Sequence, residues 1–191
     1  GRHNIMNALS ALAVCRELGI LDRVAEKLRT FRLPDLRFQV EDFGPVRVVS
    51  DHYNANIGSM GAALDEFDAM QVSGRRVLVC GDMLEMGDHR ENVHRRLGRR
   101  VGETKADEVW ALGEAGTLVV EAAREIRPLP AHWDRDVDRA AERIADSLLP
   151  GDVVLIKGSR GMRLERVADA IRRAFAPDPA ASKPDAVRTL T

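Results

Sequence analysis

Apolar positions recur at helical spacing in the first part of the chain. Residues 3–18 carry an apolar series at the spacing of one helix face, formed by Ile5, Ala8, Leu9, Leu12, Ala13 and Leu18. Gly19 follows as a natural stop, and a second, shorter helix is predicted over 21–29. The pattern therefore predicts a short helical segment ahead of the rest of the chain.

The pattern then changes to short apolar runs. Arg37 to Val40 and Val46 to Val49 read as two strands, and the residues between them include Gly44 and Pro45. A turn-rich link of this kind is suited to a hairpin over 41–45.

From Ser59 onward, helical and strand patterns alternate. Helices are predicted at 59–70, 89–102, 114–125, 136–148 and 161–175, and strands at 75–80, 107–112, 129–132 (weak) and 152–156. Strands that alternate with helices imply right-handed crossovers and a parallel sheet covered on both faces. The runs Val77–Cys80 and Val153–Ile156 are uniformly apolar, as expected for strands buried on both sides. The predicted fold class is α/β, with a Rossmann-like, doubly wound, mostly parallel sheet.

The change of pattern near residues 30–36 suggests a domain boundary. Residues 1–30 form the helical preface, 31–176 the α/β unit, and 177–191, which are rich in proline, a flexible tail. The first residue is Gly1, so we expect the sequence to be part of a longer protein.

Charge and composition exclude several classes of function. The 29 Lys and Arg residues nearly balance the 30 Asp and Glu residues, so the chain has no net positive charge that would attract nucleic acid or an anionic membrane. No apolar run approaches the roughly 18 residues of a membrane span, and we expect no secretory signal because the first residues form no apolar h-region. Cys15 and Cys80 lie in apolar runs without a CxxC pattern, so we expect two buried free thiols and a cytoplasmic protein.

The most informative polar stretch is Asp51–Asn56, which follows a predicted strand. The Asp51 carboxylate can accept hydrogen bonds from ribose hydroxyls or hold a metal. Tyr53 offers an aromatic face and a hydroxyl, while Asn54 and Asn56 donate and accept. Open α/β sheets bind ligands at the carboxyl ends of their strands, so we expect a site here. The alternative is a locally capped turn, since Asn and Asp favour such positions.

A second stretch, Cys80–Gly87, follows the next strand along the chain. It places Asp82 and Glu85 over the same predicted sheet edge. The alternative is a connection whose acidic residues complement the next helix N-terminus. His89 and His94 stand five residues apart, which is not the spacing of a ligand pair on one helix face, so we expect core or surface histidines.

A third stretch, Lys157–Gly161, places two cations around a Gly-Ser turn. If a helix begins directly behind it, as the pattern predicts, its N-terminus favours an anion such as a carboxylate or phosphate. Two solvated charges are the alternative.

A fourth feature lies at the start of the first helix, where Asn4 and Asn7 share one face. Such a pair can read an adenine edge, whereas ordinary helix capping is the alternative. The chain has no GxxxxGK[ST] phosphate loop, no HExxH and no Ser-His-Asp pattern. A phosphate-gripping loop for a nucleoside triphosphate would therefore have to lie outside this sequence.

Taken in order, these stretches resemble the Mur ligase family. The resemblance is carried by GRHNIMNAL at 1–9, DHYNANIGSM at 51–60, GDMLEMG at 81–87 and KGSR at 157–160. It is closest to the members that add D-Ala-D-Ala in peptidoglycan synthesis, and it covers 1–30 as the last helices of a central ATPase domain and 31–176 as a C-terminal Rossmann-like domain. The resemblance therefore implies that the N-terminal domain and the ATPase core lie outside this sequence.

The resemblance implies an ATP-dependent ligase. Mg²⁺ and ATP activate a carboxylate of UDP-MurNAc-tripeptide as an acyl phosphate, and the amine of D-Ala-D-Ala displaces phosphate to form an amide. This chain by itself lacks the phosphate loop and is expected to be inactive, with no catalytic residue and no metal ligand of its own.

The resemblance also implies roles for individual residues. For ATP they are Asn4, Asn7, Arg37 and Asp51; for the substrates they are Tyr53, Asn54, Asn56, Lys157, Ser159 and Arg160. The chain departs from the family pattern at Ser50, where an aspartate is common, at His52, where a serine is usual, and at Ile57-Gly58, where Asn-Pro is common.

Other classes of function remain open on the sequence. A stand-alone Rossmann-like module could bind a nucleotide or acidic metabolite without catalysis, and a regulatory domain could only dock onto partners. A relative of the folylpolyglutamate synthases would prefer glutamate to D-Ala-D-Ala.

Overall fold

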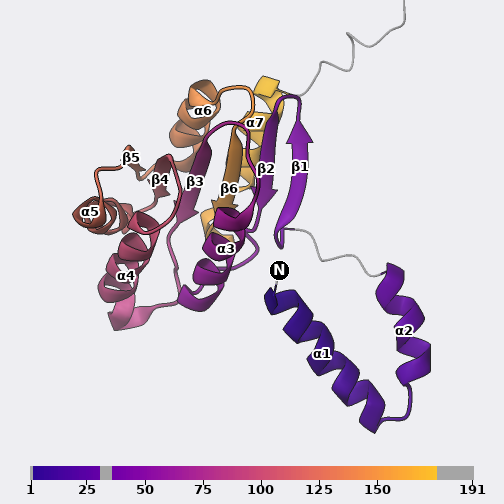
Figure 1. Ribbon diagram of the computed structural model, residues 1–191. Coiled ribbons are helices and arrows are strands. Elements are labelled where there is room, and N and C mark those ends of the chain that lie inside the picture. The colour runs from indigo at the N-terminus through magenta and orange to yellow at the C-terminus, as the bar shows by residue number, and fades with distance from the viewer. Residues whose placement is uncertain (1, 31–35, 176–191) are drawn as a thin grey trace, which may run out of the picture.

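Residues 36–175 form a six-stranded sheet with helices on both faces (Figure 1). The computed structural model describes residues 2–30 and 36–175, so residue 1, the link 31–35 and residues 176–191, which include the predicted tail 177–191, lie outside the described residues. The strands are β1 (Gln39–Phe43), β2 (Val46–Ser50), β3 (Arg76–Gly81), β4 (Glu108–Leu112), β5 (Ala131–Asp134) and β6 (Val153–Lys157). The α/β class and the hairpin between the first two strands are confirmed.

The order across the sheet is β1-β2-β6-β3-β4-β5. Every neighbouring pair is parallel except β1 and β2. The register sets Ser50 beside Ile156 on one side of β6 and Cys80 beside Lys157 on the other. The carboxyl ends of β2, β6, β3 and β4 therefore meet at one edge, where open α/β sheets bind ligands.

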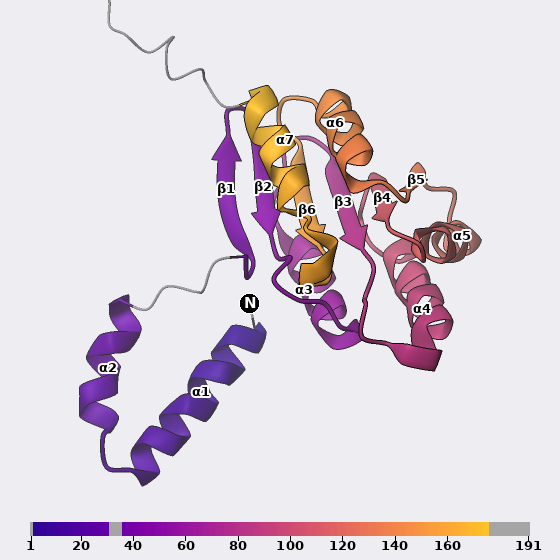
Figure 2. The same ribbon diagram turned by 180° about the vertical axis from the view of Figure 1, so that it is seen from behind.

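Two layers of helices bury the sheet (Figures 1 and 2). One core cluster joins α3 (Ile57–Ala69), α4 (Arg90–Gly102) and α5 (Gly116–Ile126) to one face. The other joins α6 (Val137–Ser147) and α7 (Glu165–Phe175) to the opposite face. Leu78 belongs to the first cluster, whereas Val77 and Val79 belong to the second, so β3 is buried on both sides as its apolar run predicts.

The predicted helical preface is present as α1 (Arg2–Glu17) and α2 (Leu21–Thr30). In both views this hairpin lies apart from the sheet, on the side where β2 and β6 end (Figures 1 and 2). Its apolar row is exposed to a large extent: Ile5 is 61% exposed, Leu9 53% and Leu18 66%. None of the described helices is both long and apolar enough to cross a membrane.

Several predicted boundaries were wrong. The first strand begins at Gln39 rather than Arg37, and the hairpin turn is only Gly44 and Pro45. The third helix begins at Ile57 because Asn56 and Ser59 form a reciprocal capping box. The predicted helix 161–175 is two elements, a 3₁₀ turn η2 (Arg160–Met162) and α7 from Glu165; η1 (Gly87–His89) likewise precedes α4.

The two cysteines differ. Cys80 is buried in β3, as expected, and burial raises the pKa of its thiol to about 12. Cys15 on α1 is only partly buried, so that prediction was wrong. The prediction assumed that the apolar face of α1 is covered, whereas its large apolar side chains are exposed.

Candidate functional site

The loop after β2 and the end of β6 are joined by a buried ion pair. Lys157 Nζ lies 2.8 Å from Asp51 Oδ2 and donates to the carbonyl oxygens of Asp51 and Asn54 at 3.3 Å each. Lys157 is 2% exposed. The structure thus brings Asp51, Asn54 and Lys157 together, but the ammonium is occupied inside the protein rather than presented to solvent.

The other oxygen of Asp51 holds the segment before β1. Asp51 Oδ1 accepts a hydrogen bond from Phe38 N at 3.2 Å, and Tyr53 N donates to Leu36 O at 3.2 Å. The Arg37 guanidinium carbon lies 4.5 Å from the centroid of the Tyr53 ring, a cation–π contact. Arg37 and Tyr53, which were assigned to different substrates, therefore form one unit at this edge.

The two asparagines make local contacts. Asn54 Oδ1 accepts from Ala55 N at 2.7 Å, and Asn56 Oδ1 accepts from Ser59 N at 2.8 Å. Both residues are exposed. The capped-turn interpretation thus describes Asn56 in this structure, while its substrate role stays a prediction.

His52 lies beneath the same loop. It is 1% exposed, and neither ring nitrogen has a hydrogen-bond partner among the described residues. Burial lowers the pKa of the imidazole, although Glu165 Oε2, 4.0 Å from Nδ1, opposes that shift. His52 is therefore a neutral side chain near pH 7.

The Lys157–Gly161 turn does not lead into a long helix. Ser159 Oγ accepts from Leu84 N at 3.0 Å, and Ser159 N donates to Asp82 O at 3.2 Å. Arg160 pairs with Glu165 at 3.2 Å. Because α7 begins only at Glu165, the helix-terminus argument for an anion site at this turn was wrong.

The amide pair on α1 is the least defined of the predicted sites. Asn7 is exposed on the helical hairpin, and the side chain of Asn4 lies outside the described part of the chain. Their nucleotide role stays a prediction.

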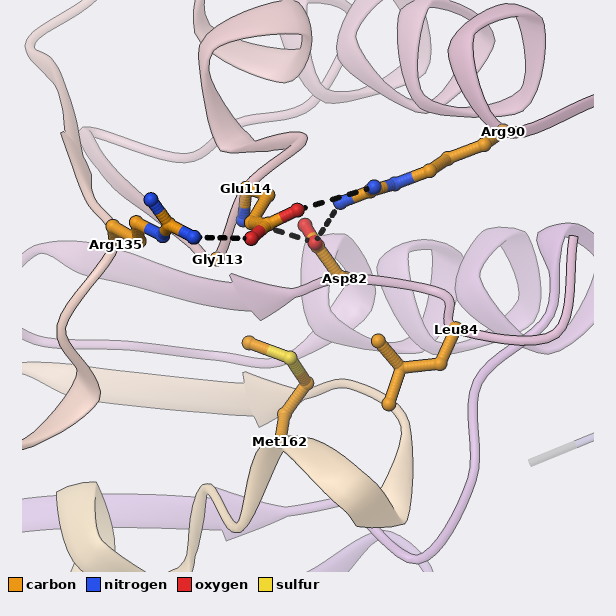
Figure 3. Close-up of a pocket in the computed structure, with 7 residues that line it drawn as sticks. All are labelled: Asp82, Leu84, Arg90, Gly113, Glu114, Arg135 and Met162. Atoms are coloured by element: carbon orange, nitrogen blue, oxygen red, sulfur yellow. Dashed lines mark hydrogen bonds and ion pairs between the residues drawn. The ribbon is translucent and has the colours of Figure 1, made fainter.

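A pocket of about 390 Å³ opens at the ends of β3 and β4 (Figure 3). Its lining is Asp82, Leu84, Arg90, Gly113, Glu114, Arg135 and Met162. Asp82 and Leu84 belong to the stretch noticed in the sequence. Arg90 is the first residue of α4, and the other four come from the connections after β4, β5 and β6; none of the five carried a local signal.

Asp82 organises the pocket. Its buried carboxylate accepts hydrogen bonds from Glu114 N at 3.0 Å and Ala115 N at 3.1 Å, and it pairs with Arg90 at 2.9 Å. Its backbone partners therefore lie in the turn just before α5 and not at the start of α4, the next α-helix along the chain. The alternative interpretation was that the acidic residues complement the N-terminus of the next helix, α4. For Asp82 it was wrong, because the carboxylate accepts from backbone groups after the neighbouring strand β4.

Charges of both signs line the mouth of the pocket. Glu114 lies between two guanidinium groups, 2.5 Å from Arg135 and 3.4 Å from Arg90 (Figure 3). Leu84, which is 50% exposed, and Met162 supply the apolar side. Such a pocket matches a small zwitterion with aliphatic groups, because each end of the ligand meets an opposite charge.

His94 supports the loop from behind. Its Nε2 accepts from Met83 N at 3.1 Å and its Nδ1 donates to Arg90 O at 2.7 Å, which fixes a neutral tautomer. His94 is buried and His89 is exposed, so the expected core and surface histidines are confirmed. No group of three or more His, Cys, Asp or Glu side chains suited to a metal occurs within the described residues.

Comparison with known proteins identifies relatives of this arrangement. A family profile described as "Mur ligase, glutamate ligase domain" matches residues 36–160. The UDP-N-acetylmuramoyl-tripeptide–D-alanyl-D-alanine ligase of Bacillus subtilis is 32% identical over 176 residues, which cover 87% of this chain. The ligase of the same name from Escherichia coli is 32% identical over 174 residues, covering 90% of this chain. The chain spans 37% of the length of each relative.

Solved structures give the same result. A MurF crystal structure from Acinetobacter baumannii superposes with a TM-score of 0.79 at 26% identity, covering 91% of this chain and 38% of that one. MurF ligase from Thermotoga maritima in complex with ADP superposes with a TM-score of 0.68 at 27% identity, covering 90% and 38% respectively.

Proposed function

Because the chain belongs to the Mur ligase family, whose glutamate ligase domain profile matches residues 36–160, we propose that residues 36–175 are the amino-acid-binding domain of a ligase. The ligase would join D-Ala-D-Ala to UDP-MurNAc-tripeptide, as the names of the relatives from B. subtilis and E. coli state for those proteins. The observation that carries the proposal is the pocket at the ends of β3 and β4, with charges of both signs beside an apolar wall.

The pocket fits the chemistry of the dipeptide. A guanidinium of Arg90 or Arg135 can hold its carboxylate through two parallel hydrogen bonds, and Glu114 can accept from its ammonium group. Leu84 and Met162 offer apolar surface to the two methyl groups. Ser159 would not contact the dipeptide itself. Its hydrogen bonds hold the backbone of Leu84 and Asp82, which line the pocket.

The predicted substrate role of Lys157 takes a different form in this proposal. Lys157 is buried against Asp51, so we assign it to the shape of the loop after β2 rather than to the dipeptide carboxylate. Arg160, whose side chain is 56% exposed, remains free to turn toward a ligand at the cost of its pair with Glu165.

ATP would meet a different part of the edge. Arg37 stacked on the half-exposed Tyr53 offers a cation and an aromatic face, and Asp51 offers a carboxylate for hydroxyl donors, so these residues fit a nucleotide. ATP, when bound, supplies the phosphoryl group that activates the acceptor carboxylate. This chain's own contribution is to hold the amine in line and keep water away from it. We assign Mg²⁺ no ligand in this chain.

The helical hairpin would belong to the neighbouring ATPase domain. Its exposed Ile5, Leu9 and Leu18 support this, because an apolar row of that length requires a cover. In the complete ligase, movement of the α/β unit toward that domain would bring the amine to the activated carboxylate.

The test is an NMR titration of this chain with D-Ala-D-Ala. We expect saturable shifts at Arg90, Glu114 and Met162 at millimolar concentrations. Glu114→Gln should weaken binding about tenfold by removing the charged acceptor, whereas N-acetyl-D-Ala-D-Ala, which lacks the ammonium group, should bind poorly to both proteins.

Two further measurements complete the experiment, one with a control variant and one with glutamate as the ligand. Glu142→Gln changes an exposed acid on α6, away from the pocket, and should leave binding unchanged. Shifts that avoid the pocket, or a failure to saturate, would refute the assignment. Tighter binding of glutamate than of D-Ala-D-Ala would instead favour the folylpolyglutamate synthase-like alternative.

A further inference from the structure

The two arginines that line the pocket have different partners inside the protein. Arg90 donates from Nη2 to the buried carboxylate of Asp82 at 2.9 Å and from Nη1 to Glu114 at 3.4 Å. Arg135 donates only from Nη2, to Glu114 at 2.5 Å, and its side chain makes no other ion pair or hydrogen bond within residues 36–175. The side chains of Arg135 and Glu114 are 70% and 55% exposed. Arg135 therefore belongs to a surface pair, whereas Arg90 compensates a buried charge.

This difference decides which guanidinium can bind a ligand carboxylate. Two parallel hydrogen bonds to a carboxylate need two neighbouring N–H donors, and Arg90 already uses both of its terminal nitrogens. Moving Arg90 would also leave the buried Asp82 without its cation, which is strongly destabilising. Moving Arg135 breaks only an exposed pair, which contributes little to stability because solvent screens it.

The backbone beneath Glu114 is fixed from both neighbouring strands. Asp82, which follows β3, accepts from Glu114 N at 3.0 Å. Trp133 on β5 donates from Nε1 to Gly113 O at 2.7 Å. The carboxylate of Glu114 can therefore change its partner by rotation of the side chain alone, while the backbone of the pocket stays in place (Figure 3).

We propose that Arg135 is the residue that recognises the ligand carboxylate and that Glu114 competes with the ligand for it. Binding exchanges the partners of both groups. The ligand carboxylate accepts two parallel hydrogen bonds from Arg135, and Glu114 accepts from the ligand ammonium group instead. Arg90 stays against Asp82 throughout. This inference rests on the proposed function and deepens it, because it assigns the carboxylate to one residue and couples the two ends of the ligand.

The exchange makes the pocket selective for ligands that carry both charges. A dipeptide amide has no carboxylate to replace Glu114 at Arg135, so the exposed pair stays intact and the ligand gains nothing from it. An N-acylated dipeptide offers Glu114 no cation in return, so two carboxylates compete for one guanidinium. Only a ligand with a free amine and a free carboxylate gives both residues a new partner.

An NMR titration with two ligands tests the assignment. D-Ala-D-Ala carries both charges, whereas D-Ala-D-Ala amide keeps the amine and lacks the carboxylate. In the parent chain we expect the amide to bind about tenfold more weakly than the dipeptide, because Arg135 contributes nothing to its binding. In Arg135→Gln the affinity for the dipeptide should fall by about the same factor, so that the two Kd values agree within about twofold.

Two further variants separate recognition from general effects. Arg135→Lys retains a cation without the planar pair of donors, so it should restore part of the preference for the dipeptide. Arg173→Gln is the matched control. It breaks a pair of similar exposure with Glu142, away from the pocket, and should leave the preference unchanged.

Nitrogen-15 relaxation of the Arg135 Nε–H group tests the exchange of partners itself. Glu114→Gln removes the charged partner of Arg135, so it should make this group more mobile on the picosecond-to-nanosecond timescale than in the parent. Saturating D-Ala-D-Ala should shift the Nε resonance in the parent, whereas the amide should leave it in place.

The proposal is overturned if Arg135→Gln keeps the parent's preference for the dipeptide, because another cation then binds the carboxylate. It is also overturned if Arg135 Nε–H is equally mobile in the parent and in Glu114→Gln, because the competing pair then does not exist in solution. Both results leave the dipeptide site standing as long as D-Ala-D-Ala saturates the parent. If neither ligand saturates the parent, the dipeptide site is refuted, and the assignment of Arg135 with it.

Discussion

Lys157 and Asp51, separated by 106 residues in sequence, form an ion pair of 2.8 Å at the carboxyl edge of the sheet. The lysine is almost fully buried, and its remaining donors go to backbone carbonyls of the same loop. Removing one partner of such a pair leaves the other charge without compensation.

We therefore expect Lys157→Met to lower the free energy of unfolding by about 3 kcal/mol in urea denaturation. Asp51→Asn in the same chain should recover part of the loss, because it removes the orphaned charge. Arg47→Met breaks the exposed pair with Asp42 and should cause no measurable change. Equal losses in the two single variants would show that burial does not set the cost.

Gly113 should tolerate no side chain. Its φ is +109°, and a Cβ atom there would lie 2.7 Å from Asp82 Cγ and 2.8 Å from Met162 Cε. Gly87→Ala, at φ +47° with open space around it, measures the backbone cost alone, about 1–2 kcal/mol. Gly113→Ala should cost clearly more and also abolish ligand binding in the pocket. Equal unfolding midpoints for the two variants would argue against the steric explanation.

His52 should make stability depend on pH. Burial lowers its folded-state pKa below the ordinary value of 6.5, so below that pH the unfolded chain binds more protons than the folded one. Its contribution is fully present above pH 6.5 and is lost as pH falls through the folded pKa, at up to about 1.4 kcal/mol per pH unit. Urea titrations at several pH values should show this loss in the parent and not in His52→Asn. If the free energy of unfolding depends on pH in the same way in both proteins, His52 is not the source of that dependence.

The two thiols should react differently with Ellman's reagent. Cys15 is partly exposed and should react in the folded protein, whereas Cys80, buried with a pKa of about 12, should react only after unfolding. The Cys15→Ser variant should give no signal until denaturant is added. Rapid reaction in that variant would mean that β3 opens readily.

The fold could be predicted from the sequence because its signals are local. The uniformly apolar runs at 77–80 and 153–156 are what a strand covered on both faces requires, and the alternation with helices fixes the parallel class. Even the shifted start of α3 had a local signal, the Asn56 and Ser59 capping box.

The site could be predicted only in part, because its contacts are long-range. Lys157 was assigned to a loop, yet β6 continues through it and directs it to a carboxylate far away in sequence. No local sequence pattern marked Arg90, Glu114 and Arg135 as site residues. They come together only because β3, β4 and β5 end side by side. Asp82 was noticed, but its partner helix could not be inferred without the sheet order.

The strand order also bears on how the protein is made. β6 is the last strand to be synthesised, yet it lies between β2 and β3, which do not pair with each other. Until residue 157 has been synthesised, no strand can join the β1–β2 pair to the β3, β4 and β5 strands. We therefore expect truncation ahead of β6 to leave two parts that cannot complete a core, and folding to be slow for a domain of this size.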